Sequence, residues 1–175
     1  MSIREYDSVV IGSGPAGEGA TMKLAKSGQR VAVVEAYPRV GGGCTHWGTI
    51  PSKALRHGIQ LLADYRSNPL FQKTAGQLHI GYPELLAAAG SAIDLQVGTR
   101  YRYYQRNRVD LVHGRARFAT PHAIEVQTPQ GTVETLRAAN VVIATGSRPY
   151  RPDDIDFNHP RVLDSDTLLA LGTTP

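Results

Sequence analysis

The sequence predicts an α/β fold in which a parallel sheet opens with a βαβ unit and is followed by a small antiparallel β meander. Two apolar runs without alternation, residues 6–12 and 30–35, are typical of strands buried on both faces of a parallel sheet. Residues 15–27 between them have a helical pattern, and Gly28 follows where helices commonly end. Beyond residue 110, short β-rich runs alternate with turn signals such as TPQGT, which predicts hairpins.

The middle of the chain is predicted to be helical. Residues 44–66 form one expected helix, with Pro51 near its start, and a polar connection follows it. A long amphipathic helix comes next, because apolar side chains recur at three- and four-residue steps at Leu86, Ala89, Ile93, Val97, Tyr101 and Tyr104. The tyrosines of RYRYYQRNR (100–108) are expected to be buried on one face, with the arginines near the C-terminus of the helix, where positive charge complements its dipole.

The last third is predicted to return to the sheet. A strand is expected at residues 110–113, then the antiparallel meander, and then a last buried strand at residues 140–146 that rejoins the main sheet. The remaining residues are rich in loop signals, and no further βαβ unit follows them. The fold is therefore expected to be incomplete.

Length and composition bound the class of protein. The 175 residues match one ordinary domain, and no apolar run approaches the roughly 20 residues of a membrane-spanning helix. The start lacks a signal-peptide pattern and there is one cysteine, so we expect a cytoplasmic protein. A net charge of +4 is attributed to solubility, and the burial expected for the tyrosines argues against a nucleic-acid partner. We expect no membrane segment and no metal site.

A glycine-rich motif carries the chemistry of the first βαβ unit. Gly12, Gly14 and Gly17 have the G-x-G-x-x-G spacing, directly between a predicted strand and a predicted helix. They permit the tight turn, the approach of a pyrophosphate to the backbone, and close packing of helix on strand. Glu35 ends the second strand, eighteen residues after Gly17, where a carboxylate accepts ribose hydroxyls. The residues alone leave FAD and NAD both open as the ligand.

The next segment decides between the two ligands by resemblance. EAYPRVGGGCTHWGTIPSK resembles the flavin-binding segment of the class I pyridine nucleotide–disulfide oxidoreductases, and Cys44, Gly48 and residues 50–53 match that family. VVIATGSRP (141–149) and HGRARF (113–118) resemble two further family segments that lie near the flavin and the adenine. Motif and resemblance together assign these FAD-binding residues: Gly12, Gly14, Pro15, Ala16, Gly17, Glu35, Ala36, Gly42, Gly43, Cys44, Gly48, Lys53, Ala116, Ala144, Thr145 and Gly146.

The resemblance implies a Rossmann-like FAD-binding domain of which residues 1–175 are the first segment. The family's NAD-binding and dimerisation domains are absent from this length of chain. Because the family has a dimerisation domain, the resemblance implies that the complete enzyme is a homo-oligomer. The chain by itself is expected to have little activity.

One departure from the family pattern changes the expected reaction. The family has a second cysteine where this chain has Thr49, so no disulfide joins that position to Cys44. Reduced flavin must then pass its electrons on by another route, and we expect hydride transfer from NADPH to NAD⁺ through FAD. Lys53 is expected to tune the flavin, while Cys44 and Thr49 are weaker catalytic candidates. Two alternatives stay open: a single-cysteine flavin oxidase or peroxidase that cycles Cys44 through a sulfenate, and a non-catalytic flavin-binding fragment.

Overall fold

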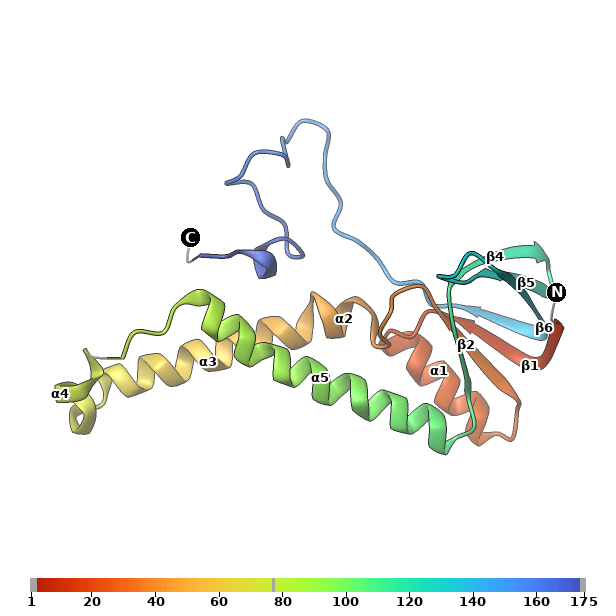
Figure 1. The fold of residues 1–175 in the computed structure, drawn as a ribbon, viewed down its shortest axis with the longest axis horizontal. Coiled ribbons are helices and arrows are strands. Elements are labelled where there is room, and N and C mark those ends of the chain that lie inside the picture. Colours follow the sequence, from red (N-terminus) through yellow and green to blue (C-terminus); the bar gives the residue numbers. More distant parts are fainter. Residues whose placement is uncertain (1–2, 77, 174–175) are drawn as a thin grey trace. The chain divides into compact units, whose positions relative to one another are not determined.

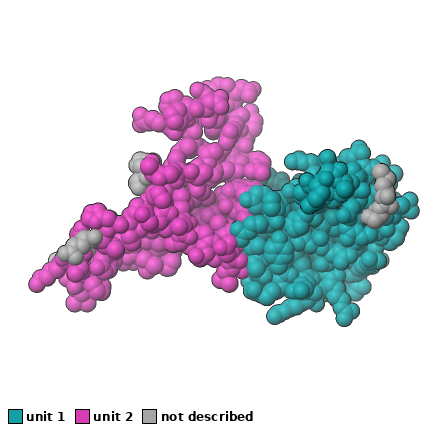
Figure 2. Space-filling model, viewed as in Figure 1, with its two compact units in different colours: residues 1–44, 96–147 teal, residues 45–95, 148–175 magenta. Residues whose placement is uncertain are grey.

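The computed structural model describes residues 3–76 and 78–173. It divides into two compact units, which are considered separately below (Figure 2). The first unit contains residues 1–44 and 96–147, and the second contains residues 45–95 and 148–175.

The first unit is built on a mixed sheet, as the sequence predicts. Among the described residues, six strands form this sheet in the order β3-β2-β1-β6-β5-β4 (Figure 1). The parallel pairs are β1 with β2, β1 with β6 and β2 with β3, while β4, β5 and β6 pair antiparallel. Their bounds are Ile3–Ile11 (β1), Val31–Glu35 (β2), Asp110–His113 (β3), Arg115–Thr120 (β4), Ala123–Gln127 (β5) and Val133–Ile143 (β6).

The expected last strand is wrong in extent and in burial. Residues 140–143 are the second half of the eleven-residue strand β6, whose first half pairs with β5 in the meander. Residues 144–146 lie beyond the strand, and Ile143 is 66% exposed. The meander and the parallel sheet are thus one continuous sheet, because β6 pairs with β1 along almost its whole length.

Helix α1 (Pro15–Lys26) covers part of this sheet, and it contacts β1, β2 and β6 (Figure 1). It ends as predicted: Gly28 takes a φ of +88°, and its N–H donates to the Ala25 carbonyl oxygen at 3.1 Å. The core of the unit consists of buried side chains from the strands, chiefly Tyr6, Val9, Ala32, Val34, Val112, Ile124, Val126, Leu136 and Ala138.

The helix predicted at residues 44–66 is two helices. Helix α2 spans Gly42–His46, and helix α3 spans Thr49–Ser67 after a break at Trp47 and Gly48. Gly48 has φ −119° and ψ −114°, a backbone conformation outside the helical region, so the helix cannot continue through it. Pro51 is tolerated because it lies in the first turn of α3, where its missing N–H has no helical partner to lose.

The polar connection also contains short helices. A 3₁₀ turn, η1, spans Pro69–Phe71, and α4 spans Gln72–Ala75. The long helix α5 spans Tyr82–Arg106, and the last element, η2, is a 3₁₀ turn at Leu168–Ala170. In the second unit, Arg148 lies over the ring of Trp47 and pairs with Asp166, which holds the loop-rich end of the chain against the α2–α3 break.

The burial expected for the tyrosines of α5 is only partly right. Tyr104 is 2% exposed, whereas Tyr101 is 37% and Tyr103 is 42% exposed. Successive residues of a helix are about 100° apart, so side chains one and three positions from Tyr104 lie at the edge of its buried face or outside it. None of the described helices is long and apolar enough to cross a membrane.

We predict that Ile124→Ala lowers the free energy of unfolding by about 2–5 kcal/mol, because the side chain is fully buried and its removal leaves a cavity. Ile3→Ala is the matched control in another strand of the same unit, where the side chain is 54% exposed, and it should cost less than about 1 kcal/mol. Chemical denaturation followed by circular dichroism measures both values. Equal losses in the two variants would contradict the placement of the core.

Candidate functional site

The carboxyl ends of three parallel strands meet at one edge of the sheet. The Gly12 N–H donates to the Val34 carbonyl oxygen at 2.8 Å, and the Ala144 N–H donates to the Ile11 carbonyl oxygen at 2.8 Å. The Gly114 N–H donates to the Glu35 carbonyl oxygen at 2.9 Å. These bonds extend the sheet past the ends of β1, β6 and β3. In open α/β sheets, ligands bind at this edge.

Two glycines make the turn from β1 into α1 sterically possible. Gly12 has a φ of +103°, and a Cβ built there would lie 2.3 Å from the Ala144 carbonyl oxygen. A Cβ on Gly17 would lie 1.9 Å from the carbonyl oxygen of Gly12. Real Cβ atoms do not approach that closely, so helix, strand and the turn after β6 pack backbone to backbone only because both residues are glycine.

A second pair of glycines brings the segment after β2 against the same turn. A Cβ on Gly42, which has a φ of +60°, would lie 2.7 Å from the Gly14 Cα. Gly14 is the N-cap of α1, where it provides no side-chain hydrogen bond, and Pro15 is the first residue of the helix. No side chain therefore caps the N-terminus of α1, and its positive dipole end suits an anionic group.

Glu35 is held in a fixed orientation beside this turn. Its side chain is 8% exposed, and one carboxylate oxygen accepts hydrogen bonds from the backbone N–H of Ser13, at 2.9 Å, and from the Ser13 hydroxyl. The other oxygen accepts from the Tyr37 N–H at 2.8 Å. The Ser13 hydroxyl also accepts from the Gly41 N–H at 3.0 Å, so Ser13 joins the glycine motif, Glu35 and the segment before α2.

Ser13 connects the residues predicted at this sheet edge, although the sequence does not predict it as one of them. It occupies a variable position of the G-x-G-x-x-G pattern, which does not specify its side chain. A small hydroxyl side chain at this position, with Glu35 expected at the neighbouring strand end, could have indicated a hydrogen bond between the two. The structure brings the other predicted residues of the first unit to the same sheet edge or to segments that continue from it. These are Pro15 and Ala16 at the exposed start of α1, Ala36 after β2, Gly43 and Cys44 on α2, Ala116 on β4, and Ala144, Thr145 and Gly146 after β6.

Three predicted residues belong to the second unit. Gly48 precedes α3, Thr49 is its first residue, and Lys53 follows one turn later. Thr49 and Lys53 are both exposed. Across the described parts of the chain, the Lys53 ammonium makes no ion pair with a carboxylate. Cys44 is a half-buried free cysteine.

An ion pair within the first unit lies next to the glycine motif and was not predicted. Arg100 of α5 pairs with Glu18 of α1, with 2.8 Å between Arg100 Nε and Glu18 Oε2. Arg100 is expected near the C-terminus of the helix as a charge that complements the dipole, and the structure buries it to 9% exposure in this ion pair. Tyr104 is buried one turn further along α5, and burial, reinforced by the charge of Glu18, raises the pKa of its hydroxyl well above the ordinary range.

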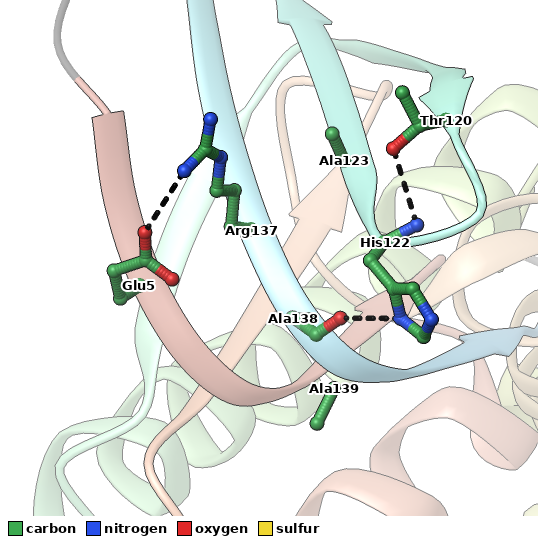
Figure 3. A pocket seen from close by; sticks show the side chains of 7 residues that line it. All are labelled: Glu5, Thr120, His122, Ala123, Arg137, Ala138 and Ala139. Carbon is green, nitrogen blue, oxygen red and sulfur yellow. Dashed lines mark hydrogen bonds and ion pairs between the residues drawn. The ribbon is translucent and has the colours of Figure 1, made fainter.

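A shallow hollow lies elsewhere on the first unit, near the start of β1 (Figure 3). It contains the ion pair of Glu5 and Arg137, at 3.8 Å, and His122, whose ring nitrogen Nδ1 is 3.1 Å from the Ala138 carbonyl oxygen. Glu5 and Arg137 are more than half exposed, and none of the predicted site residues lines the hollow. Among the described residues, no group of three or more His, Cys, Asp or Glu side chains is placed to hold a metal ion.

We predict that Gly17→Ala lowers the free energy of unfolding by about 3 kcal/mol or more, because its Cβ would overlap the Gly12 carbonyl oxygen. Gly19→Ala is the matched control in the same helix, where nothing lies within 4 Å of the added atom. It should stabilise the chain by about 0.5–1 kcal/mol, since alanine favours helix. Thermal unfolding measures both changes. The contact is disproved if Gly17→Ala is tolerated as well as Gly19→Ala.

Curated proteins similar to this chain carry a common name. The chain is 53% identical over 175 residues to a soluble pyridine nucleotide transhydrogenase of Pseudomonas putida, and 54% identical over 175 residues to one of Azotobacter vinelandii. A relative of the same name from Colwellia psychrerythraea is 52% identical over 171 residues. All or nearly all of this chain is covered in each comparison, but it spans only 37–38% of the length of these relatives.

Solved structures similar to this chain include flavoprotein disulfide reductases. A Cu(II) complex of the HOCl-induced flavoprotein disulfide reductase RclA of Escherichia coli matches 96% of this chain and 35% of its own, with a TM-score of 0.76 and 26% identity. A second RclA structure matches 95% of this chain and 34% of its own, with a TM-score of 0.74 and 25% identity. The family model described as pyridine nucleotide-disulphide oxidoreductase matches residues 6–175. The chain belongs to the pyridine nucleotide-disulphide oxidoreductase family.

Proposed function

We propose that this chain provides part of an FAD site in an enzyme that transfers hydride from NADPH to NAD⁺, an NAD(P)⁺ transhydrogenase. Similarity over the whole chain to proteins named soluble pyridine nucleotide transhydrogenase supports this activity. The observation that carries the proposal is that the chain combines a complete glycine turn and an oriented Glu35 with only one cysteine, Cys44. In this proposal, residues 1–175 are the first segment of the FAD-binding domain.

The geometry of the first unit fits a flavin dinucleotide. Gly14 and Gly42 place no side chain at the uncapped N-terminus of α1, so the N–H groups there would hold the diphosphate of FAD. Glu35 lies at the strand end, where its oriented carboxylate would accept hydrogen bonds from ribose hydroxyls. The turn after β6 and Ala116 on β4 are the other backbone segments that we assign to FAD.

The reaction we propose balances as NADPH + NAD⁺ → NADP⁺ + NADH. Bound FAD would supply an acceptor and donor of hydride, which lets the two nicotinamides react in turn at one site. Thr49 excludes a disulfide partner for Cys44, which closes the electron route to thiol substrates. Lys53 remains our candidate for stabilising negative charge near the flavin, and its exposed side chain has no paired carboxylate among the described residues.

We further infer that the enzyme is a cytoplasmic homo-oligomer without a nucleic-acid partner. The name of the relatives includes the word soluble, and a single cysteine suits a reducing compartment. Light scattering during size-exclusion chromatography tests the oligomeric state, and cell fractionation tests the location.

We expect Glu35→Gln to weaken FAD binding by about tenfold to a hundredfold, because charge-assisted hydrogen bonds to the ribose are lost. The dissociation constant is measured by quenching of FAD fluorescence during titration with the purified chain. Glu125→Gln, which alters a carboxylate paired with Arg117 on the surface of the meander, is the control and should leave the constant unchanged. Equal affinities of the Glu35 variant and the unmodified chain would remove Glu35 from the site.

Replacing Cys44 with serine separates hydride exchange from the thiol-based alternative. We expect Cys44→Ser to keep NADPH-dependent reduction of a thionicotinamide analogue of NAD⁺ within about twofold of the unmodified FAD-loaded protein. The same assay on the 175-residue chain checks the expectation that it has little activity by itself. If NADPH oxidation instead requires peroxide, forms a trappable sulfenate and is lost with Cys44, the enzyme is a single-cysteine peroxidase.

A further inference from the structure

Glu18 places a negative charge in the first turn of α1, next to the last glycine of the motif. A carboxylate there is favourable for the helix, because it interacts with the positive end of the helix dipole. The same charge works against an anionic ligand, since it cancels part of the field that attracts a diphosphate to the helix N-terminus. A site at this helix N-terminus therefore binds a dinucleotide more tightly if that charge is neutralised.

Arg100 provides this neutralisation from α5. Its Nε lies 2.8 Å from Glu18 Oε2, and the two side chains are only 11% and 20% exposed. The guanidinium is also fixed from its own helix: Nη1 donates to the Gln96 side-chain oxygen at 2.9 Å and to the Gln96 carbonyl oxygen at 3.2 Å. Because the pair is largely shielded from solvent, salt screens its interaction less than that of a surface pair.

Glu35, the second carboxylate of this region, is held differently. Among the described residues its partners are the uncharged donors of Ser13 and Tyr37, and no cation pairs with it. No cation therefore offsets this carboxylate, which suits recognition of hydroxyl groups. Of these two acidic side chains near the start of α1, Glu18 pairs with a cation, whereas Glu35 has only uncharged donors as partners among the described residues.

We propose that Arg100 is a positioning residue for FAD: it neutralises Glu18, so that the N-terminus of α1 presents a net positive potential to the diphosphate. This role rests on the proposed function, because it requires FAD to bind with its diphosphate at α1. Arg100 acts through Glu18 and the helix. The resemblance to the family assigns neither residue.

Three variants test the proposal by their FAD dissociation constants, measured on the full chain at about 20 mM and about 500 mM sodium chloride, where the screening lengths differ severalfold. Arg100→Met should weaken FAD binding about tenfold at low salt, because Glu18 is then uncompensated, and by less at high salt. Glu18→Gln should tighten binding about threefold at low salt, because Arg100 is then uncompensated. The double variant should bind within about threefold of the unmodified chain.

A purely structural role of the pair makes different predictions. Both single variants would then weaken FAD binding, the loss would not depend on salt, and Glu18→Gln would never tighten it. That pattern, or an Arg100→Met variant that binds FAD as well as the unmodified chain, overturns the proposal. If Arg100→Met does not fold, as judged by thermal unfolding without FAD, then Glu18→Gln and the double variant still decide.

Arg117→Met is the matched control, because it removes an arginine from the exposed ion pair with Glu125 in the same unit. It should leave the FAD dissociation constant unchanged at both salt concentrations. Failure of the unmodified chain to bind FAD would overturn the assignment of an FAD site to these residues and this inference with it. Binding by the unmodified chain together with unchanged binding by Arg100→Met overturns the inference alone.

Discussion

The close packing of Gly17 on the Gly12 carbonyl oxygen is the constraint on which the rest of the first unit depends. With a Cβ position only 1.9 Å from that oxygen, the contact exists only between backbones. It sets how closely α1 lies on β1, and Gly12 in turn lies against the backbone of Ala144 after β6. Three chain segments therefore converge on one small volume at the carboxyl edge of the sheet, and they meet there backbone to backbone, as a phosphate-binding turn requires.

The two carboxylates at this edge of the sheet have different partners. Glu35 is oriented by neutral donors and pairs with no cation among the described residues, whereas Glu18 is paired with Arg100 and loses most of its field. A buried ion pair is weak support for stability by itself, because desolvation of both charges offsets much of their attraction. Its position beside the turn gives the pair a stronger functional rationale than a stabilising one. The same helix thus combines a dipole that attracts anions with an acidic residue that would otherwise repel them.

Much of the fold was predictable, and the errors have identifiable physical causes. Buried parallel strands and the Gly28 helix end were predicted because they depend on local composition and backbone conformation. The true length of β6 was missed because one strand serves two partners: its first residues pair antiparallel with β5, and almost its whole length pairs parallel with β1. The break at Gly48 was missed because glycine within a helical pattern is often tolerated, and only its φ and ψ values exclude the helix. Tyr101 was expected to be buried because it fits the apolar period of α5, but its neighbours do not cover it.

The sequence by itself determined the glycine spacing, the acidic strand end and the absence of a second thiol, because each of these is a matter of residue type at a given spacing. Those features were enough to indicate a dinucleotide site without a disulfide. Only the tertiary structure decided which side chains support that site. Ser13 is tied to Glu35 across 22 positions of sequence, and Arg100 reaches Glu18 from a helix more than 80 residues away. Such pairs leave no local pattern in the sequence, because they depend on how α1, β2 and α5 pack together. The periodicity of a sequence does not encode long-range packing.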